Sequence, residues 1–110
     1  MEATLPPQIS DAIGAARRQL RALYGDRLAR VILFGSYARG EARAQSDVDL
    51  LVVLRGDVAP YSELRRMGAV QGAVLDDLGV FVSLHPYAEA DVNAGETPLI
   101  RTATREGAEV

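Results

Sequence analysis

The sequence predicts an α/β fold, in which helices flank a small central sheet. Three apolar runs predict buried strands at residues 29–34, 47–54 and 80–85, because β-branched residues are frequent in them and a glycine or proline follows each within two residues. Amphipathic helical patterns alternate with these runs, as is typical of α/β domains. The length of 110 residues, 48% of them hydrophobic, predicts a single domain over 1–110.

The first half of the chain begins with a helix and a strand. Apolar residues at steps of three and four predict the helix, namely Ile9, Ile13, Ala16, Leu20 and Leu23. The strand over 29–34 stops at Gly35, and we expect a short helix over 36–41 with Ser36 near its start. A polar stretch then leads to Ser46.

The second half is predicted around the strand over 47–54. Apart from its first acids this strand is apolar on both faces, which is typical of a central strand in a covered sheet. A long helix is predicted after it from the spacing of Leu64, Met67, Val70, Val74 and Leu78. The third strand, over 80–85, is expected to stop at Pro86. Helices over 88–94 and 98–106 follow.

Composition excludes several kinds of chemistry. The chain has no cysteine and one histidine, which excludes thiolate sites, cysteine nucleophiles and multi-histidine zinc sites. All twelve basic residues are arginine, which excludes a phosphate-loop lysine. No apolar run reaches the ~20 residues of a membrane span and no signal pattern opens the chain, so we expect no membrane partner and a cytoplasmic location.

The net charge of −3 conceals an asymmetry. Seven arginines stand against two acids over 17–43, whereas five arginines stand against eleven acids from residue 44 onward. A basic first half suits a polyanion such as a nucleotide phosphate. Charge alone nevertheless favours solvated helix faces and surface ion pairs.

The chemistry is predicted where the second strand begins. Asp47 and Asp49 stand two residues apart, so on a strand they project to one face, about 6.6 Å apart along the chain. Leu51 and Val53 continue that face as an apolar floor beneath the carboxylates. Two close carboxylates need a cation. Oxygen ligands suit Mg²⁺, which takes one or two carboxylates and completes its shell with water and substrate phosphates.

Gly35 and Ser36 predict a phosphate-binding turn. The glycine lets the backbone turn tightly and approach a ligand, and free N–H groups at Ser36 favour an anion. Arg39, one helical turn further on, is placed to clamp a phosphate, with an ion pair to Glu41 or Glu106 as the alternative. Alone, each motif favours a plain turn or cap, but their occurrence on consecutive strands favours function.

The segment 34–50 resembles the nucleotidyltransferases of the DNA polymerase β superfamily, in particular the minimal nucleotidyltransferases. Their pattern is Gly-Ser, a spacer and Asp-x-Asp; here it is Gly35-Ser36, ten residues and Asp47-Val48-Asp49. The spacer is similar to that of the antitoxin branch, which is encoded beside a HEPN-domain ribonuclease toxin. The resemblance implies a nucleotidyltransferase fold with a mixed sheet of three or more strands, ATP as substrate, Mg²⁺, and transfer of a nucleoside monophosphate.

The resemblance also implies residue roles and a partner. Asp47 and Asp49 hold the metal and carry catalysis, while Gly35 and Ser36 bind the nucleotide, with Arg39 as the added phosphate ligand. The implied acceptor is a tyrosine hydroxyl of a HEPN toxin in a hetero-oligomer, with no direct nucleic-acid contact. Two alternatives stay open: a non-catalytic antitoxin that neutralises by binding, and a small-molecule nucleotidyltransferase.

One position departs from the superfamily's pattern. A third carboxylate usually stands on the third strand, where this chain has Ser83. Three options follow: two carboxylates with a looser base, His85 on the same strand face as the substitute, or binding without catalysis. Glu89 and Glu106 are further acids whose reach to the site is open at this point.

Overall fold

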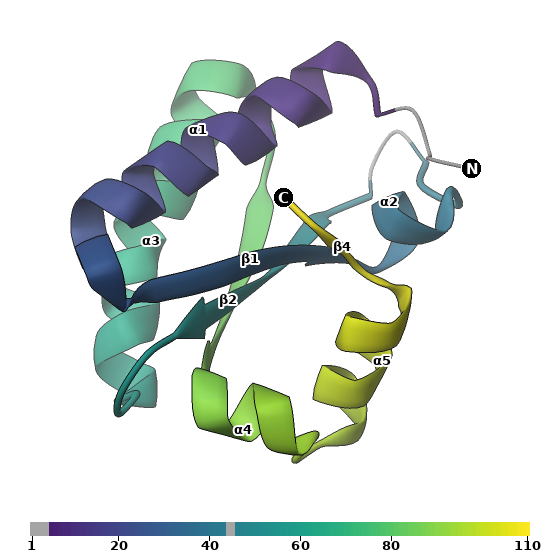
Figure 1. Cartoon of the computed structure of the whole chain (residues 1–110). Coiled ribbons are helices and arrows are strands. Elements are labelled where there is room, and N and C mark those ends of the chain that lie inside the picture. The colour runs from purple at the N-terminus through teal and green to yellow at the C-terminus, as the bar shows by residue number, and fades with distance from the viewer. Residues whose placement is uncertain (1–4, 44–45) are drawn as a thin grey trace.

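The computed structural model describes residues 5–43 and 46–110, so residues 44–45 of the polar spacer lie outside the described part. A four-stranded sheet has the order β3-β2-β1-β4 (Figure 1). Its strands are β1 (Leu28–Phe34), β2 (Val48–Leu54), β3 (Val82–Ala88) and β4 (Ala108–Glu109). Antiparallel pairing joins β1 to β2 and to β4, whereas β2 and β3 run parallel. The predicted small mixed sheet is therefore confirmed.

Helices cover both faces of this sheet, as Figure 1 shows. On one face lie α1 (Pro7–Tyr24) and α3 (Pro60–Leu78), which pack against each other, and on the other lie α4 (Glu89–Ala94) and α5 (Pro98–Glu106). A single turn, α2 (Ser36–Arg39), follows β1, and a 3₁₀ turn, η1 (Gly25–Arg27), precedes it. Along the described residues, no helix combines the length and apolar character needed to cross a membrane.

The side chains on the two faces of β2 pack into two separate parts of the hydrophobic core. Its even-numbered residues, Val48, Leu50, Val52 and Leu54, pack with α1 and α3. Leu51 and Val53 pack with Val92 of α4 and Ile100 of α5 on the opposite face. These six apolar side chains of the seven-residue β2 are fully buried, and each contributes about 1.5–3 kcal/mol of transfer free energy. This two-sided burial confirms the predicted central strand.

The third strand differs from its prediction, because it begins at Val82 and continues through Pro86 to Ala88. β3 is an edge strand with β2 on one side only. The N–H of Leu84 points away from β2 and donates to Gln71 Oε1 of α3, at 3.0 Å. Pro86 has the same parity along the strand, so its missing N–H costs no bond to β2.

Smaller corrections concern the ends of elements. The second strand begins at Val48, so Asp47 belongs to the preceding connection and not to the strand. The short helix after Gly35 ends at Arg39, because Gly40 takes a left-handed conformation with φ +73°. The two-residue β4 was not predicted. Its pairing with Ile32 and Leu33 is too short to leave a periodic pattern in the sequence.

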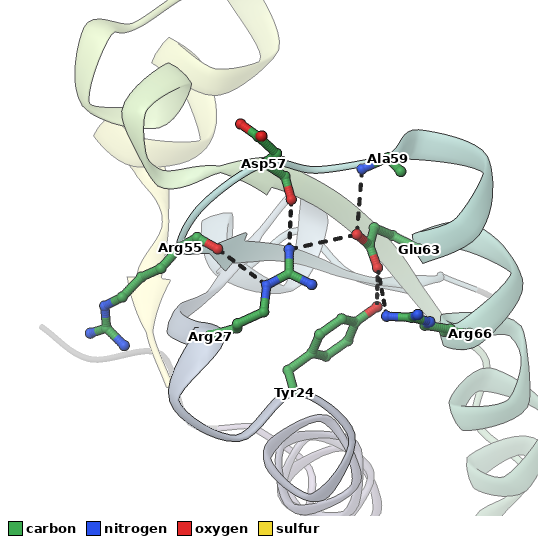
Figure 2. A network of polar contacts seen from close by, with 7 residues as sticks. All are labelled: Tyr24, Arg27, Arg55, Asp57, Ala59, Glu63 and Arg66. Atoms are coloured by element: carbon green, nitrogen blue, oxygen red, sulfur yellow. Dashed lines mark hydrogen bonds and ion pairs between the residues drawn. The ribbon is translucent and has the colours of Figure 1, made fainter.

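A buried carboxylate ties together two connections at one end of the sheet (Figure 2). Glu63 of α3 is only 3% exposed. It accepts a hydrogen bond from the Tyr24 hydroxyl at 3.1 Å, and it pairs with Arg27 at 3.7 Å and Arg66 at 3.6 Å. Arg27 also donates to the carbonyl of Asp57 at 2.7 Å. The network thus joins the start of β1 to the loop between β2 and α3.

The Tyr24–Glu63 contact predicts a loss of stability at high pH. Burial, and then the charge of Glu63, raise the pKa of Tyr24 from 10.0 to about 12. The folded protein therefore holds the phenolic proton more tightly than the unfolded chain does. This contribution is complete below pH 10 and is lost as the pH rises through about 12. Denaturant midpoints measured from about pH 9 to pH 12 should fall more for the native protein than for Tyr24→Phe.

The matched control for this prediction is Tyr61→Phe, because Tyr61 is 85% exposed. This variant should follow the pH dependence of the native protein. A Tyr24→Phe variant with the same alkaline slope as the native protein would contradict the assignment.

Candidate functional site

The carboxylate of Asp49 stands at the centre of the candidate site. Asp49 is the second residue of β2, and it lies opposite Phe34 of β1 and Ser83 of β3 in the strand register. Leu51 and Val53 are buried on the same face of the strand, so the predicted apolar floor is present. The Asp49 side chain is 30% exposed, which leaves its carboxylate accessible to a ligand.

Gly35 lies directly against this carboxylate. Its φ is +79°, a conformation that favours glycine. A Cβ atom built on Gly35 would lie 2.5 Å from Asp49 Oδ2. No real Cβ makes such a contact, so both the backbone conformation and the space demand glycine here. The structure therefore brings the Gly-Ser turn and the second acid of Asp-x-Asp together.

Ser36 begins α2, immediately after this close approach. The first helical hydrogen bond runs from the Arg39 N–H to the Gly35 carbonyl, at 3.1 Å. The preceding N–H groups have no helical partner and are available to an anion. The N-cap position is Gly35, so no side-chain oxygen caps this turn. The turn can therefore offer backbone donors and a hydroxyl beside Asp49.

Asp47 lies just outside the strand in which it was predicted. It is exposed and precedes β2 by one residue, because the ladder with β3 begins at Val48, whose N–H donates to the Phe81 carbonyl at 3.3 Å. Within residues 5–43 and 46–110, no three histidine or carboxylate side chains gather closely enough to hold a metal ion. The strand start is thus corrected by one residue, from Asp47 to Val48, while the pairing of Asp47 with Asp49 as metal ligands stays a prediction.

His85 contacts Asp49 from the neighbouring strand. Its Nε2 atom lies 3.5 Å from Asp49 Oδ1 and 3.1 Å from Ser83 Oγ. The Phe34 ring also packs against the imidazole in a T-shaped arrangement, with 5.2 Å between the ring centroids. Ser83 therefore lies beside Asp49, as expected from the motif, and His85 reaches the same carboxylate. The packing of Phe34 on His85 was not predicted, because it joins two different strands.

Arg39 forms both of the ion pairs considered as alternatives to phosphate binding. Its Nε lies 3.2 Å from Glu41 Oε2, and a terminal nitrogen lies 3.6 Å from Glu106 Oε2. The hydrogen bond from Glu41 raises the pKa of Arg39 further. Glu106 therefore reaches α2 through this arginine. Glu89 begins α4 beyond Ala88, which pairs with Leu54 at the opposite end of β2 from Asp49, so Glu89 lies away from the site.

The donor chemistry of Asp47 and Asp49 fits a hard divalent cation. Both side chains supply only oxygen, and both reach solvent. Among the described residues, no arginine lies within ion-pair distance of either carboxylate. Mg²⁺ is usually held by one or two carboxylates together with water and substrate phosphates. The residues present match that arrangement.

A glycine-serine turn against a carboxylate of a central strand, on a small mixed sheet, defines a site of the nucleotidyl-transfer class. The family model described as "Nucleotidyltransferase domain" matches residues 13–107. The chain belongs to this family, which confirms the resemblance drawn from Gly35-Ser36 and Asp47-Val48-Asp49.

Known proteins extend this comparison. A protein adenylyltransferase named MntA, from Thermococcus cleftensis, is 44% identical over 45 residues, which are 41% of this chain and 43% of that protein. The matched segments cover 35% to 48% of the lengths of the curated relatives, and thus less than half of each.

Two solved structures share the fold. A mutant of the toxin–antitoxin complex MntA–HpeT has a TM-score of 0.63 at 20% identity, over 97% of this chain and 72% of that chain. A toxin–antitoxin complex with AMP-PNP has a TM-score of 0.60 at 19% identity, over 86% of this chain and 68% of that chain.

The close approach of Gly35 to Asp49 predicts a specific mutational coupling. Gly35→Ala should cost about 1–3 kcal/mol for the backbone conformation, with φ +79° and ψ −154°, and a further ~1–3 kcal/mol for crowding Asp49. Gly56→Ala is the matched control, because Gly56 has φ +80° with nothing within 4 Å of its Cβ position. In an Asp49→Ala background the extra cost at Gly35 should disappear.

Denaturant unfolding of Gly35→Ala, Gly56→Ala, Asp49→Ala and the Gly35→Ala/Asp49→Ala double variant measures this coupling. An equal cost of Gly35→Ala in the native and the Asp49→Ala backgrounds would show that Asp49 does not press on Gly35.

Proposed function

We propose that this protein transfers AMP from Mg–ATP to a tyrosine hydroxyl of a partner HEPN-domain toxin and so acts as its antitoxin. The observation that carries the proposal is the contact between Gly35 and Asp49, which sets a phosphate-binding turn beside a carboxylate. Family membership supports the reaction class. The name of the Thermococcus cleftensis relative supports a protein as acceptor. The shared fold of toxin–antitoxin complexes, one with AMP-PNP, supports an adenine nucleotide and a toxin partner.

The proposed reaction is an in-line displacement at the α-phosphorus of ATP. The tyrosine oxygen forms the new bond to phosphorus, the bond to the bridging oxygen of the β-phosphate breaks, and pyrophosphate leaves. The phenolic proton passes to solvent. Catalysis of such a transfer rests mainly on positioning and on neutralising developing charge. Mg²⁺, when bound, supplies that neutralisation at the phosphate oxygens.

The residues of this chain divide the work of binding and orientation. Asp49, which lies against Gly35, and Asp47, which directly precedes β2, hold the cation from the protein side. The N–H groups at Ser36 and its hydroxyl hold the departing phosphates. Arg39 adds positive charge next to this turn while Glu41 and Glu106 orient its guanidinium.

A phenolic acceptor suits a site that has Ser83 instead of a third acid. The pKa of tyrosine, about 10, lies far below that of a sugar hydroxyl. A tyrosine oxygen therefore requires less help from a base than the 3′-hydroxyl of a nucleic acid. This difference supports a protein acceptor over extension of a nucleic-acid strand.

Ser83 also favours a second candidate function, in which the protein neutralises a toxin only by covering it. In that case the nucleotide would serve binding and not transfer. The two functions differ in one observable, which is whether the partner gains covalent mass.

The transfer reaction predicts a mass increase of the partner. After incubation with the co-expressed toxin, ATP and Mg²⁺, mass spectrometry should show one or more added AMP groups on a toxin tyrosine. Asp47→Asn and Asp49→Asn should reduce this modification at least about 10²-fold, because each removes charge that holds the cation. Asp76→Asn is the matched control, since Asp76 is an exposed acid of α3 and should leave transfer unchanged.

Three results discriminate among the functions. A neutralised toxin without added mass would establish the binding-only antitoxin. Equal modification by Asp49→Asn and the native protein would overturn the catalytic assignment. A toxin that is neither modified nor bound would overturn the antitoxin proposal as a whole.

Metal-dependent nucleotide binding provides a separate prediction. The carboxylate of Asp49 beside the phosphate-binding turn, together with that of the nearby Asp47, should repel free ATP and attract its metal complex. Calorimetry should therefore show binding of Mg–ATP that is at least about tenfold tighter than binding of ATP in EDTA. The preference should vanish in Asp49→Asn, and equal affinities in the native protein would count against a metal at this position.

A further inference from the structure

We propose that His85 is a direct ligand of the divalent cation held by Asp49, and that this nitrogen ligand shifts the site from Mg²⁺ toward first-row transition metals, with Mn²⁺ as the spectroscopic probe. The inference rests on the proposed function in one respect, since it takes Asp49 to hold a cation. It assigns to His85 a role as a metal ligand, distinct from that of a base.

The spacing of the two donor atoms suits a shared ion. His85 Nε2 and Asp49 Oδ1 lie 3.5 Å apart. Two donors bound to one divalent ion at about 2.1 Å stand roughly 3.0–3.4 Å apart, depending on the angle between them. The observed separation therefore needs an adjustment of only a few tenths of an ångström. Both side chains are about one-third exposed, at 32% and 30%, so an ion can reach them.

The imidazole is held in place before any ion arrives. Phe34 of β1 packs against the His85 ring, with 5.2 Å between the two ring centroids. Ser83, which lies on β3 like His85, places its Oγ 3.1 Å from Nε2. Binding of an ion at Nε2 replaces the contact with Ser83 and leaves the contact with Phe34 intact. The ring therefore needs no large rotation to become a ligand.

The chemistry of this donor pair favours first-row transition metals over Mg²⁺. Carboxylate and water suit Mg²⁺ and Mn²⁺ alike, whereas imidazole suits iron, nickel, copper and zinc, and the affinity of such a site rises from Mn²⁺ along that series. Asp49 and Asp47 alone would form a site with oxygen ligands only. The His85 nitrogen, 3.5 Å from Asp49 Oδ1, changes which metal ion the site prefers. No arginine within ion-pair distance of Asp49, among the described residues, competes for the carboxylate.

Pulsed electron paramagnetic resonance of Mn²⁺ tests the ligand directly. The chain has one histidine, so an imidazole nitrogen detected on Mn²⁺ in untagged protein must come from His85. The probe is Mn²⁺ with inorganic tripolyphosphate, which contains no nitrogen of its own. We expect ¹⁴N modulation in the native protein and its loss in His85→Gln, which keeps a polar group for Asp49 and Ser83.

Affinities provide the second readout. His85→Gln should weaken Mn²⁺ binding by about tenfold, while Mg²⁺ binding stays within about twofold. A tenfold loss is at the lower end of the range seen when residues around a bound metal are replaced. Ser83→Ala is the matched control, because it removes the contact at Nε2 but keeps the imidazole, and it should retain the ¹⁴N signal. Thermal melts of all variants establish that they fold.

The outcomes separate this inference from the proposed function. Mn²⁺ bound in an Asp49-dependent manner without ¹⁴N modulation would overturn the role of His85 alone, because the cation site would remain. Equal losses of Mn²⁺ and Mg²⁺ affinity in His85→Gln would make His85 a positioning residue for Asp49. Mn²⁺ binding that is unaffected by Asp49→Asn would instead overturn the metal site on which the proposed function depends.

Discussion

The approach of Gly35 to Asp49 is the constraint on which the rest of the site depends. The last residue of β1, Phe34, lies opposite Asp49 in the antiparallel register, so the chain leaving β1 must turn across the Asp49 carboxylate. Only glycine meets both the space and the φ of +79° at that turn. The parallel register of β2 and β3 places Ser83 on the other side of Asp49. Two strand pairings that meet at Asp49 thus fix the turn, the acid and the neighbouring polar residues together.

Much of the fold was predictable because its strongest signals are local. The two-sided apolar character of β2 predicts a central strand, and the spacing of apolar residues predicts α1 and α3. The extent of β3 was not predictable from the chain alone. Proline interrupts a strand unless its nitrogen faces away from the neighbouring strand. Here Pro86 meets this condition because β3 is an edge strand whose outward side contacts Gln71 of a distant helix. Likewise, Glu63 is buried only because α1 and η1 supply Tyr24 and Arg27.

The candidate site was predictable to the same degree, and for the same reason. Gly35-Ser36 and Asp47-Val48-Asp49 form short motifs whose chemistry follows from their residue types. The contacts of Arg39 required knowledge of α5, because Glu106 is far from it in sequence but adjacent in space. The contact between His85 and Asp49 required the parallel register of β2 and β3. Strand periodicity alone placed His85 on the same face as Ser83 but did not show which carboxylate it would reach.

Two carboxylates at opposite ends of the sheet illustrate how the chain separates stability from ligand binding. Glu63 is almost wholly buried, and two arginines, a tyrosine hydroxyl and a backbone N–H surround it. Its charge is compensated within the protein, so removal of any partner leaves a costly buried charge. Asp49 is part-exposed, and its neighbours are a glycine, a serine and a histidine.

This difference in compensation also explains the absence of an arginine beside Asp49 in the described part of the chain. A guanidinium in ion-pair contact would occupy the oxygens that a cation requires, and it would remain charged at every physiological pH. The arginine nearest in sequence to the turn, Arg39, is instead engaged by Glu41 and Glu106. Those two acids therefore compensate the charge of Arg39, and no ion pair among the described residues joins it to Asp49.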